Sequence, residues 1–166
     1  GTSALKTTLM DARRSIVYEN SYGYTILQPQ EGWREIDPDV WMQAVMKGLH
    51  DICARCNPQE VSVIGVTGQM HTTVFLDKNG EAVRNAIMWT DLRTAGMVEE
   101  LRTECSQREE TRHIAEILSP GSPAVNTLWI KEHEPQSFAR IHKIMTPYAY
   151  IVYKLTGQYS MDYCEA

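Results

Sequence analysis

A short polar corner between two apolar runs carries the first residues of this sequence that suggest chemistry. Residues 61–76 read V-S-V-I-G-V-T-G-Q-M-H-T-T-V-F-L, a pattern typical of two strands separated by a break. Gln69, Met70 and His71 then lie together at a strand end, where α/β proteins usually present ligand-binding side chains. Gly68 permits close approach of the backbone. The alternative is an ordinary hairpin with His71 as a solvated turn residue.

The first residues form a small polar turn before a strand-like run. Gly1, Thr2 and Ser3 offer backbone N–H groups and hydroxyls, which can bond phosphate oxygens. Lys6 adds a positive charge close by. The turn therefore suggests a phosphate site, although Gly-Thr-Ser is equally typical of a tag remnant.

Trp89 and Asp91 stand where a strand-like run gives way to a helical one. At such a junction an indole ring and a carboxylate can form the wall of a site for a polyol. The alternative is structural, with a tryptophan at an interface beside a helix N-cap.

Four cysteines, Cys53, Cys56, Cys105 and Cys164, are too few and too scattered for a disulfide framework. Cys53 and Cys56 form a C-x-x-C spacing with His50 nearby, which raises a zinc or redox hypothesis. No second ligand pair follows, and two cysteines three apart at the end of an amphipathic helix are neighbours on its core side. The sequence therefore predicts no metal site.

Alternating and helical periodicities place these candidates on an α/β framework. Strands are expected at residues 4–11, 16–26, 61–66, 72–76, 82–89 and 141–145, with a return towards strand at residues 159–163. Helices are expected from Asp37-Pro38 to near Asn57, from Thr90-Asp91 through Leu101, over residues 124–134, and from Thr146-Pro147 to a C′ glycine at Gly157. An Asn-Gly turn at residues 79–80 joins two of the strands.

Composition sets the outer limits of function. A chain of 166 residues with 43% hydrophobic and 22% charged residues is expected to form about one globular domain with a real core. A net charge of -5 without a basic stripe argues against a nucleic-acid partner. No apolar run approaches the roughly 18 residues of a membrane span, so no membrane partner is expected and the cytoplasm is the default location.

Six motifs, in order along the chain, resemble the FGGY family of carbohydrate kinases, and most closely its xylulokinase branch. They are G-T-S-A-L-K at residues 1–6, G-W-R-E-I-D-P-D-V-W at 32–41, G-Q-M-H at 68–71, A-I-M-W-T-D-L-R at 86–93, Y-K-L-T-G at 153–157 and D-Y-C-E-A at 162–166. Each motif alone is weak, but six in register over nearly the whole chain are specific.

The resemblance implies an actin-like, ribonuclease-H-like α/β fold with a mixed five-stranded sheet flanked by helices. It also implies that a sugar and ATP bind between two such domains, with Mg²⁺, and that the γ-phosphoryl group passes to a sugar hydroxyl. The implied partners are a small-molecule sugar and the C-terminal kinase domain of the same parent chain. A homodimer is left open.

Matched to the family, Thr2, Ser3 and Lys6 resemble the first phosphate loop, which approaches the ATP phosphates. Trp89 and Asp91 resemble the sugar-side wall of the pocket.

Met70 and His71, next to Gln69, resemble the pair that contacts the sugar, where glycerol kinases carry Arg-Glu. An imidazole suits sugar hydroxyls, because the protein contributes mainly positioning and charge stabilisation to phosphoryl transfer.

Three departures from the family pattern bear on the prediction. The first strand of the family, which ends in a metal-facing Asp-x-Gly, would precede Gly1, and the catalytic aspartate would lie beyond Ala166. Residues 1–166 are therefore expected to be part of an N-terminal domain that is inactive in isolation. Residues 125–130 read V-N-T-L-W-I where xylulokinases usually carry P-K-L-L-W-L. This leaves the sugar open, since gluconokinases share the Met-His pair.

Two further classes of function remain as alternatives. A non-catalytic sugar-binding or regulatory module would use the same corner without turning the sugar over. An actin-like ATPase of the chaperone type would share the phosphate turn, but it gives no reason for G-Q-M-H or W-T-D-L-R.

Overall fold

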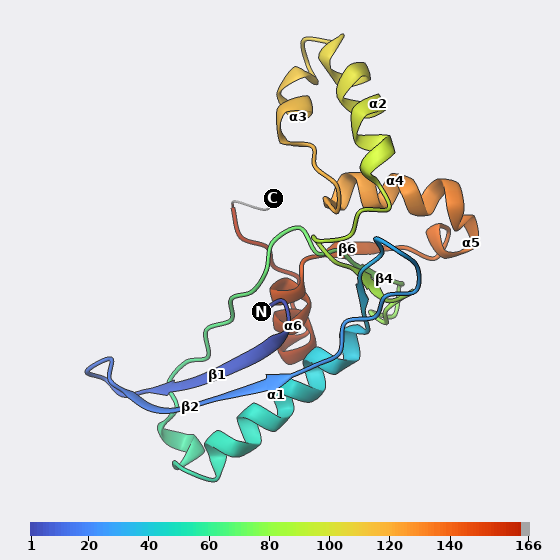
Figure 1. Cartoon of the computed structure of the whole chain (residues 1–166). Helices are drawn as coiled ribbons and strands as arrows, with labels where there is room; N and C mark the ends of the chain where they lie inside the picture. Colours follow the sequence, from blue (N-terminus) through green and yellow to red (C-terminus); the bar gives the residue numbers. More distant parts are fainter. Residues whose placement is uncertain (164–166) are drawn as a thin grey trace.

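The computed structural model describes residues 1–163, so Cys164, Glu165 and Ala166 of the last motif lie outside the described residues. The strands are β1 Ala4–Met10, β2 Ile16–Gly23, β3 Glu35–Ile36, β4 Val74–Leu76, β5 Ala86–Ile87 and β6 Lys143–Met145 (Figure 1). The helices are α1 Pro38–Cys53, α2 Ala95–Ser106, α3 Arg112–Ile117, α4 Pro123–His133, α5 Pro135–Phe138 and α6 Pro147–Thr156, with a 3₁₀ turn at Pro58–Glu60.

The N-terminal hairpin lies along helix α1. Strands β1 and β2 form an antiparallel ladder, as the alternation of the sequence predicts. Figure 1 shows both strands running beside α1. Gly48 on α1 makes the close approach feasible, because a Cβ atom at this position would collide with the Thr7 hydroxyl of β1.

Helix α1 begins where the sequence predicts. The Asp37 side chain accepts a hydrogen bond from the Asp39 N–H at 3.0 Å, which caps the helix, and Pro38 occupies its first position. Trp41 and Ile52 on the inner face are buried, and Trp41 joins the main core.

Strand β4 is the centre of the core. Its three residues Val74, Phe75 and Leu76 have no exposed area. Successive side chains of a strand point to opposite faces, so Val74 and Leu76 pack in the cluster that contains Tyr150, while Phe75 packs in the cluster that contains Trp129. The corner that precedes β4 is therefore attached to a fully buried strand.

The paired strands form a smaller sheet than the resemblance implies. β4 pairs with β6 and β3 with β5, and a bridge between Thr73 and Ile87 links the two pairs. Every ladder in residues 1–163 is antiparallel, and β1 and β2 form a sheet of their own. The expected mixed five-stranded sheet is not confirmed.

The predicted strand at residues 61–66 was wrong for the described chain. No ladder or isolated bridge includes these residues, and the side chain of Val63 is 82% exposed. β-branched residues favour an extended backbone, but a strand also needs a neighbour that accepts and donates its backbone hydrogen bonds. Residues 1–163 place no such neighbour beside this segment. Residues 159–163 likewise form no strand.

One helix boundary and one cysteine differ from the prediction. Helix α2 begins at Ala95 and not at Asp91. Thr94 takes the N-cap position without a side-chain capping hydrogen bond, and its hydroxyl accepts the Gly121 N–H at 3.1 Å instead. Cys53 is exposed and does not lie on the core side of α1. The C′ glycine of α6 is confirmed, since Gly157 adopts a left-handed φ of 72°.

The helices at the far end from the hairpin form an arm. Figure 1 shows α2 and α3 side by side, beyond α4. Val98 of α2 packs there with Leu118 and with Val125 of α4. Within residues 1–163, no helix has the length and apolar character needed to cross a membrane.

A buried ion network holds the strand-to-helix junction. The guanidinium of Arg93 donates to both oxygens of the Asp91 carboxylate, at 2.9 and 2.8 Å, and to Glu35 at 2.8 Å. The N–H of Arg34 donates to Asp91 at 2.6 Å. The side chains of Asp91 and Arg93 are 0% and 1% exposed, so both charges depend on these partners.

Aromatic rings complete the network. The Arg93 guanidinium lies 3.9 Å from the ring centroid of Trp33 and 4.9 Å from that of Trp129. The two rings meet edge to face, with centroids 5.2 Å apart, and the cation lies over both. A planar cation over a ring gains cation–π attraction while it keeps its in-plane hydrogen bonds. Arg84 pairs with Glu35 and with Glu134 at the outer edge. The network thus joins the chain segments around residues 33–35 and 89–93.

We expect Arg93→Ala to lower the free energy of unfolding by about 3–5 kcal/mol, because it leaves Asp91 buried without its cation. Glu134→Ala is the matched control. It removes a 29% exposed member of the same network and should cost about 1 kcal/mol or less. Urea denaturation of the purified chain measures both values, and equal losses for the two variants would contradict this account.

Candidate functional site

The corner before β4 holds His71 in an unusual backbone conformation. Its φ is +60°, in the left-handed region that residues other than glycine rarely adopt. The Thr72 N–H donates to the Met70 carbonyl at 2.6 Å, which closes the turn tightly. Met70 is 58% exposed, and His71 is partly exposed. Backbone strain of this kind costs on the order of 1–3 kcal/mol and is often found at functional sites.

Two threonines that follow His71 tie the corner to its surroundings. The Thr73 hydroxyl donates to the His71 carbonyl at 3.0 Å. The Thr72 hydroxyl accepts the Trp89 backbone N–H at 3.1 Å. Both threonines have no exposed area, so these bonds are shielded from water. The turn that carries His71 and the turn that carries Trp89 are therefore fixed to each other.

Trp89 also reaches the N-terminal turn. Its indole is 45% exposed, and the indole N–H donates to the Thr2 hydroxyl oxygen at 3.3 Å. A hydroxyl that accepts one hydrogen bond can still donate its own proton to another acceptor. The structure thus brings together three segments that the sequence singled out separately, namely the turn with Thr2, the corner with His71 and the junction with Trp89.

Gln69 brings an unpartnered amide to the same corner. Its side-chain nitrogen and oxygen are both buried, and neither makes a hydrogen bond within residues 1–163. Buried amides in folded proteins nearly always have partners. Gly68 packs closely against Tyr148 of α6, where a Cβ atom would lie 3.2 Å from the Tyr148 Cβ. The close approach predicted at Gly68 is therefore confirmed, and Gln69 has donor and acceptor capacity to spare.

Asp91, Lys6 and Ser3 differ from the other candidates. Asp91 lies beneath the corner with no exposed area, and both its oxygens are occupied by the network around Arg93. A direct contact with a ligand would require the carboxylate to leave these partners, so the geometry gives Asp91 a structural role and not a place in the pocket wall. Lys6 is exposed on β1 and pairs with Glu19 at 3.2 Å, and Ser3 is exposed.

The residues present fit a phosphate group better than a metal ion. The Thr2 hydroxyl has a proton to offer beside the corner, which suits a phosphate oxygen of ATP. No group of three His, Cys, Asp or Glu side chains in residues 1–163 is arranged to hold a metal ion. No described residue is therefore assigned to Mg²⁺.

Sequence reasoning missed four residues that organise the site: Thr72, Thr73, Gly121 and Asn126. Gly121 adopts a φ of +77°, and a Cβ atom there would lie 2.7 Å from the Trp89 carbonyl oxygen. The sequence S-P-G-S-P marks a loop, but it does not show which turn the loop packs against. In the sequence, two hydroxyl-bearing residues directly follow His71, and this could have indicated that Thr72 and Thr73 bond the backbone of the corner.

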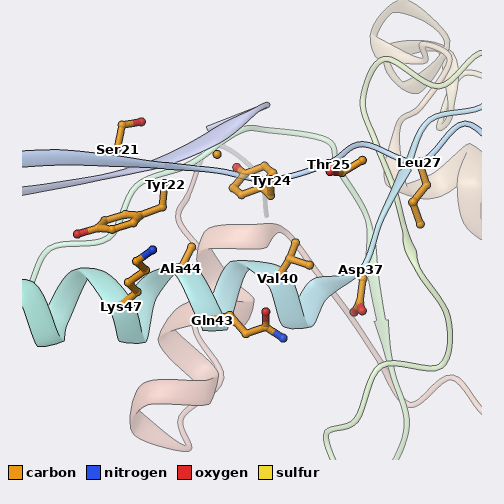
Figure 2. A pocket seen from close by; sticks show the side chains of 11 residues that line it. Ser21, Tyr22, Tyr24, Thr25, Leu27, Asp37, Val40, Gln43, Ala44 and Lys47 are labelled. Atoms are coloured by element: carbon orange, nitrogen blue, oxygen red, sulfur yellow. The ribbon is translucent and has the colours of Figure 1, made fainter.

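A groove between the hairpin and α1 lies outside this site. It has a volume of about 640 Å³ and is lined by Ser21, Tyr22, Gly23, Tyr24, Thr25, Leu27, Asp37, Val40, Gln43, Ala44 and Lys47. Figure 2 shows the ring of Tyr24 between the strand and the helix. Burial raises the pKa of Tyr24, whose hydroxyl donates to the Gly1 carbonyl. None of Met70, His71 and Trp89 lines the groove.

Comparison with known proteins places this geometry in a family. The profile of the FGGY family of carbohydrate kinases, N-terminal domain, matches residues 1–166. Xylulose kinase from Staphylococcus xylosus is 35% identical over 157 residues, which cover 95% of this chain and 32% of that protein. The chain spans about a third of the length of the curated relatives that it matches.

Solved structures agree with the sequence match. The xylulose kinase from Rhodospirillum rubrum superposes with a TM-score of 0.82 at 26% identity, over 97% of this chain and 34% of that one. Gluconate kinase from Lactobacillus acidophilus superposes with a TM-score of 0.81 at 24% identity, over 95% and 32%, a likeness of fold alone. With its motifs, its fold and its whole length matched, the chain belongs to the FGGY family of carbohydrate kinases.

Proposed function

We propose that the whole protein transfers the γ-phosphoryl group of ATP to a hydroxyl of a sugar, with the pentulose D-xylulose as the first candidate. This chain supplies one wall of the cleft. The observation that carries the proposal is the contact between Thr2 and Trp89. The indole N–H of Trp89 donates to the hydroxyl oxygen of Thr2 at 3.3 Å. This contact supports the proposal, because Trp89 is also bonded to Thr72 beside the His71 corner, and in-line transfer needs the phosphate and sugar groups close together.

Each described residue has a separate task in this proposal. The His71 imidazole bonds sugar hydroxyls, and the exposed face of Trp89 packs against the carbon skeleton of the sugar. The Thr2 hydroxyl donates to a phosphate oxygen, with Ser3 next to it in the turn and Lys6 following on β1. ATP supplies the transferred group when it binds, and Mg²⁺ would neutralise phosphate charge. Gln69 and Met70 complete the sugar side.

The remaining machinery is proposed to lie in the rest of the protein. Proton transfer from the sugar hydroxyl needs a base within hydrogen-bond reach, and closure of the cleft needs a second domain. The matched relatives are about three times as long as this chain, which supports a C-terminal kinase domain as the partner. We therefore propose that residues 1–166 alone do not phosphorylate a sugar. We also propose a cytoplasmic location, and a homodimer stays a prediction.

A coupled ADP-release assay on the whole protein tests this function. D-xylulose, D-gluconate and glycerol are each supplied with ATP and Mg²⁺, and we expect the highest kcat/KM with D-xylulose. A preference for D-gluconate would support the proposed kinase reaction but would make D-gluconate the substrate in place of D-xylulose. Sugar binding without ADP release would favour a non-catalytic module and overturn the proposed reaction.

We expect His71→Ala to raise the sugar KM, with a loss of roughly 1–3 kcal/mol in kcat/KM, because hydrogen bonds to the sugar are removed. The affinity for ATP without sugar should barely change. His50→Ala, which removes an exposed imidazole on α1, is the control and should leave all constants unchanged. An unchanged sugar KM in His71→Ala would remove His71 from the site.

Thr2→Val should weaken nucleotide binding and leave equilibrium sugar binding nearly intact, because valine keeps the shape of threonine but has no hydroxyl for a phosphate oxygen. Isothermal titration with ATP and with D-xylulose, each alone, measures the two affinities. If both fall equally, the variant has perturbed the fold or the turn does not serve the nucleotide.

A further inference from the structure

Asn126 on α4 is a buried polar residue to which neither the sequence nor the proposed chemistry assigns a task. We propose that Asn126 is a positioning residue for the sugar site, and that it acts on His71 through the hydroxyl of Thr73. This inference rests on the proposed function, since it concerns how the sugar-binding imidazole is held. Asn126 has no exposed area, so it cannot touch the sugar itself.

The hydrogen bonds run in one direction. The Asn126 side-chain NH₂ can only donate, and it donates to the Thr73 hydroxyl oxygen at 2.9 Å. The Thr73 hydroxyl has one proton, and it donates that proton to the His71 carbonyl at 3.0 Å. Asn126, Thr73 and His71 therefore form a directed chain of two bonds, which we call the relay. The Asn126 side-chain oxygen is buried and makes no hydrogen bond within residues 1–163, so the amide acts here through its NH₂ alone.

The relay ends at the strained residue of the corner. His71 holds a φ of +60°, and such a conformation persists only where surrounding contacts impose it. The bond to the His71 carbonyl restrains the peptide plane directly after His71, and so helps to hold the backbone from which the imidazole projects. Without the Thr73 hydroxyl, we expect the residue to sample other φ values and to hold its imidazole less well.

Asn126 also reaches the second turn of the site. Its NH₂ donates to the Gly121 carbonyl at 2.9 Å. Gly121 in turn packs so closely on Trp89 that any Cβ atom there would overlap the Trp89 carbonyl. One amide group thus sets the positions of the His71 corner and of the loop beneath Trp89, the two parts proposed to enclose the sugar.

Variants at Thr73 separate this role from simple packing. Thr73→Val removes the hydroxyl but keeps the shape and the two backbone bonds to Ile87, at 2.8 and 3.1 Å. Thr73→Ser keeps the hydroxyl and should restore the relay. Val74→Ala, at the next and fully buried position, weakens the core without touching the relay. These three variants and Asn126→Ala are compared in the whole protein.

For Thr73→Val and Asn126→Ala we expect the sugar KM to rise about five- to tenfold, with the ATP KM changed by less than about twofold. Thr73→Ser should remain near the wild type. Val74→Ala should lower the melting temperature at least as much as Thr73→Val while the sugar KM stays unchanged. If Thr73→Val leaves the sugar KM unchanged while His71→Ala raises it, the relay is overturned and the sugar site stands.

If His71→Ala has no effect on the sugar KM, a second measurement is needed to test the relay, and hydrogen exchange followed by mass spectrometry provides it. The unchanged sugar KM would overturn the proposed sugar contact, and the relay would then be judged by exchange in peptides that cover residues 69–73. Faster exchange in Thr73→Val than in Thr73→Ser supports the relay. Equal exchange in the two variants overturns it.

Discussion

A buried cation determines where the candidate site lies in this chain. The Arg93 guanidinium lies over the rings of Trp33 and Trp129 and bonds the carboxylates of Asp91 and Glu35. Buried charges are costly unless every partner is in place, so the segments that carry these residues can pack in one arrangement only. Trp89 lies two residues before Asp91 in the sequence, so this network sets the position of the turn that carries Trp89.

The site is built outwards from that fixed point. Trp89 bonds Thr72 through its backbone and Thr2 through its indole, which ties the junction, the corner and the N-terminal turn together. A second set of bonds from Asn126 supports the corner from the other side. Such rigid placement suits phosphoryl transfer, in which the protein acts mainly by positioning. The strain at His71 is compatible with this, because neighbouring bonds hold it.

Local signals in the sequence predicted the elements that depend on local chemistry. The cap at Asp37 and the C′ glycine at Gly157 both appear where expected, since a cap needs only its own turn. The strand at residues 61–66 was wrong because pairing is a property of two segments, and the propensity of one does not supply the other. Asp91 was predicted at the pocket wall because it lies at a strand-to-helix junction and matches the family motif, but the ion network buries it. Asn126 lies in a helix that mixes apolar and polar residues, and its burial depends on which face packs inwards.

The central claim is that His71 and Trp89 form the sugar-facing wall of a kinase cleft, with Asp91 beneath it. The most direct test is a crystal structure of the whole protein with D-xylulose and a non-hydrolysable ATP analogue. The account predicts a sugar hydroxyl within hydrogen-bond distance of the His71 imidazole, the sugar against the Trp89 indole, and the Asp91 carboxylate still bonded to Arg93. A sugar bound away from His71 and Trp89, or coordinated directly by Asp91, would contradict it.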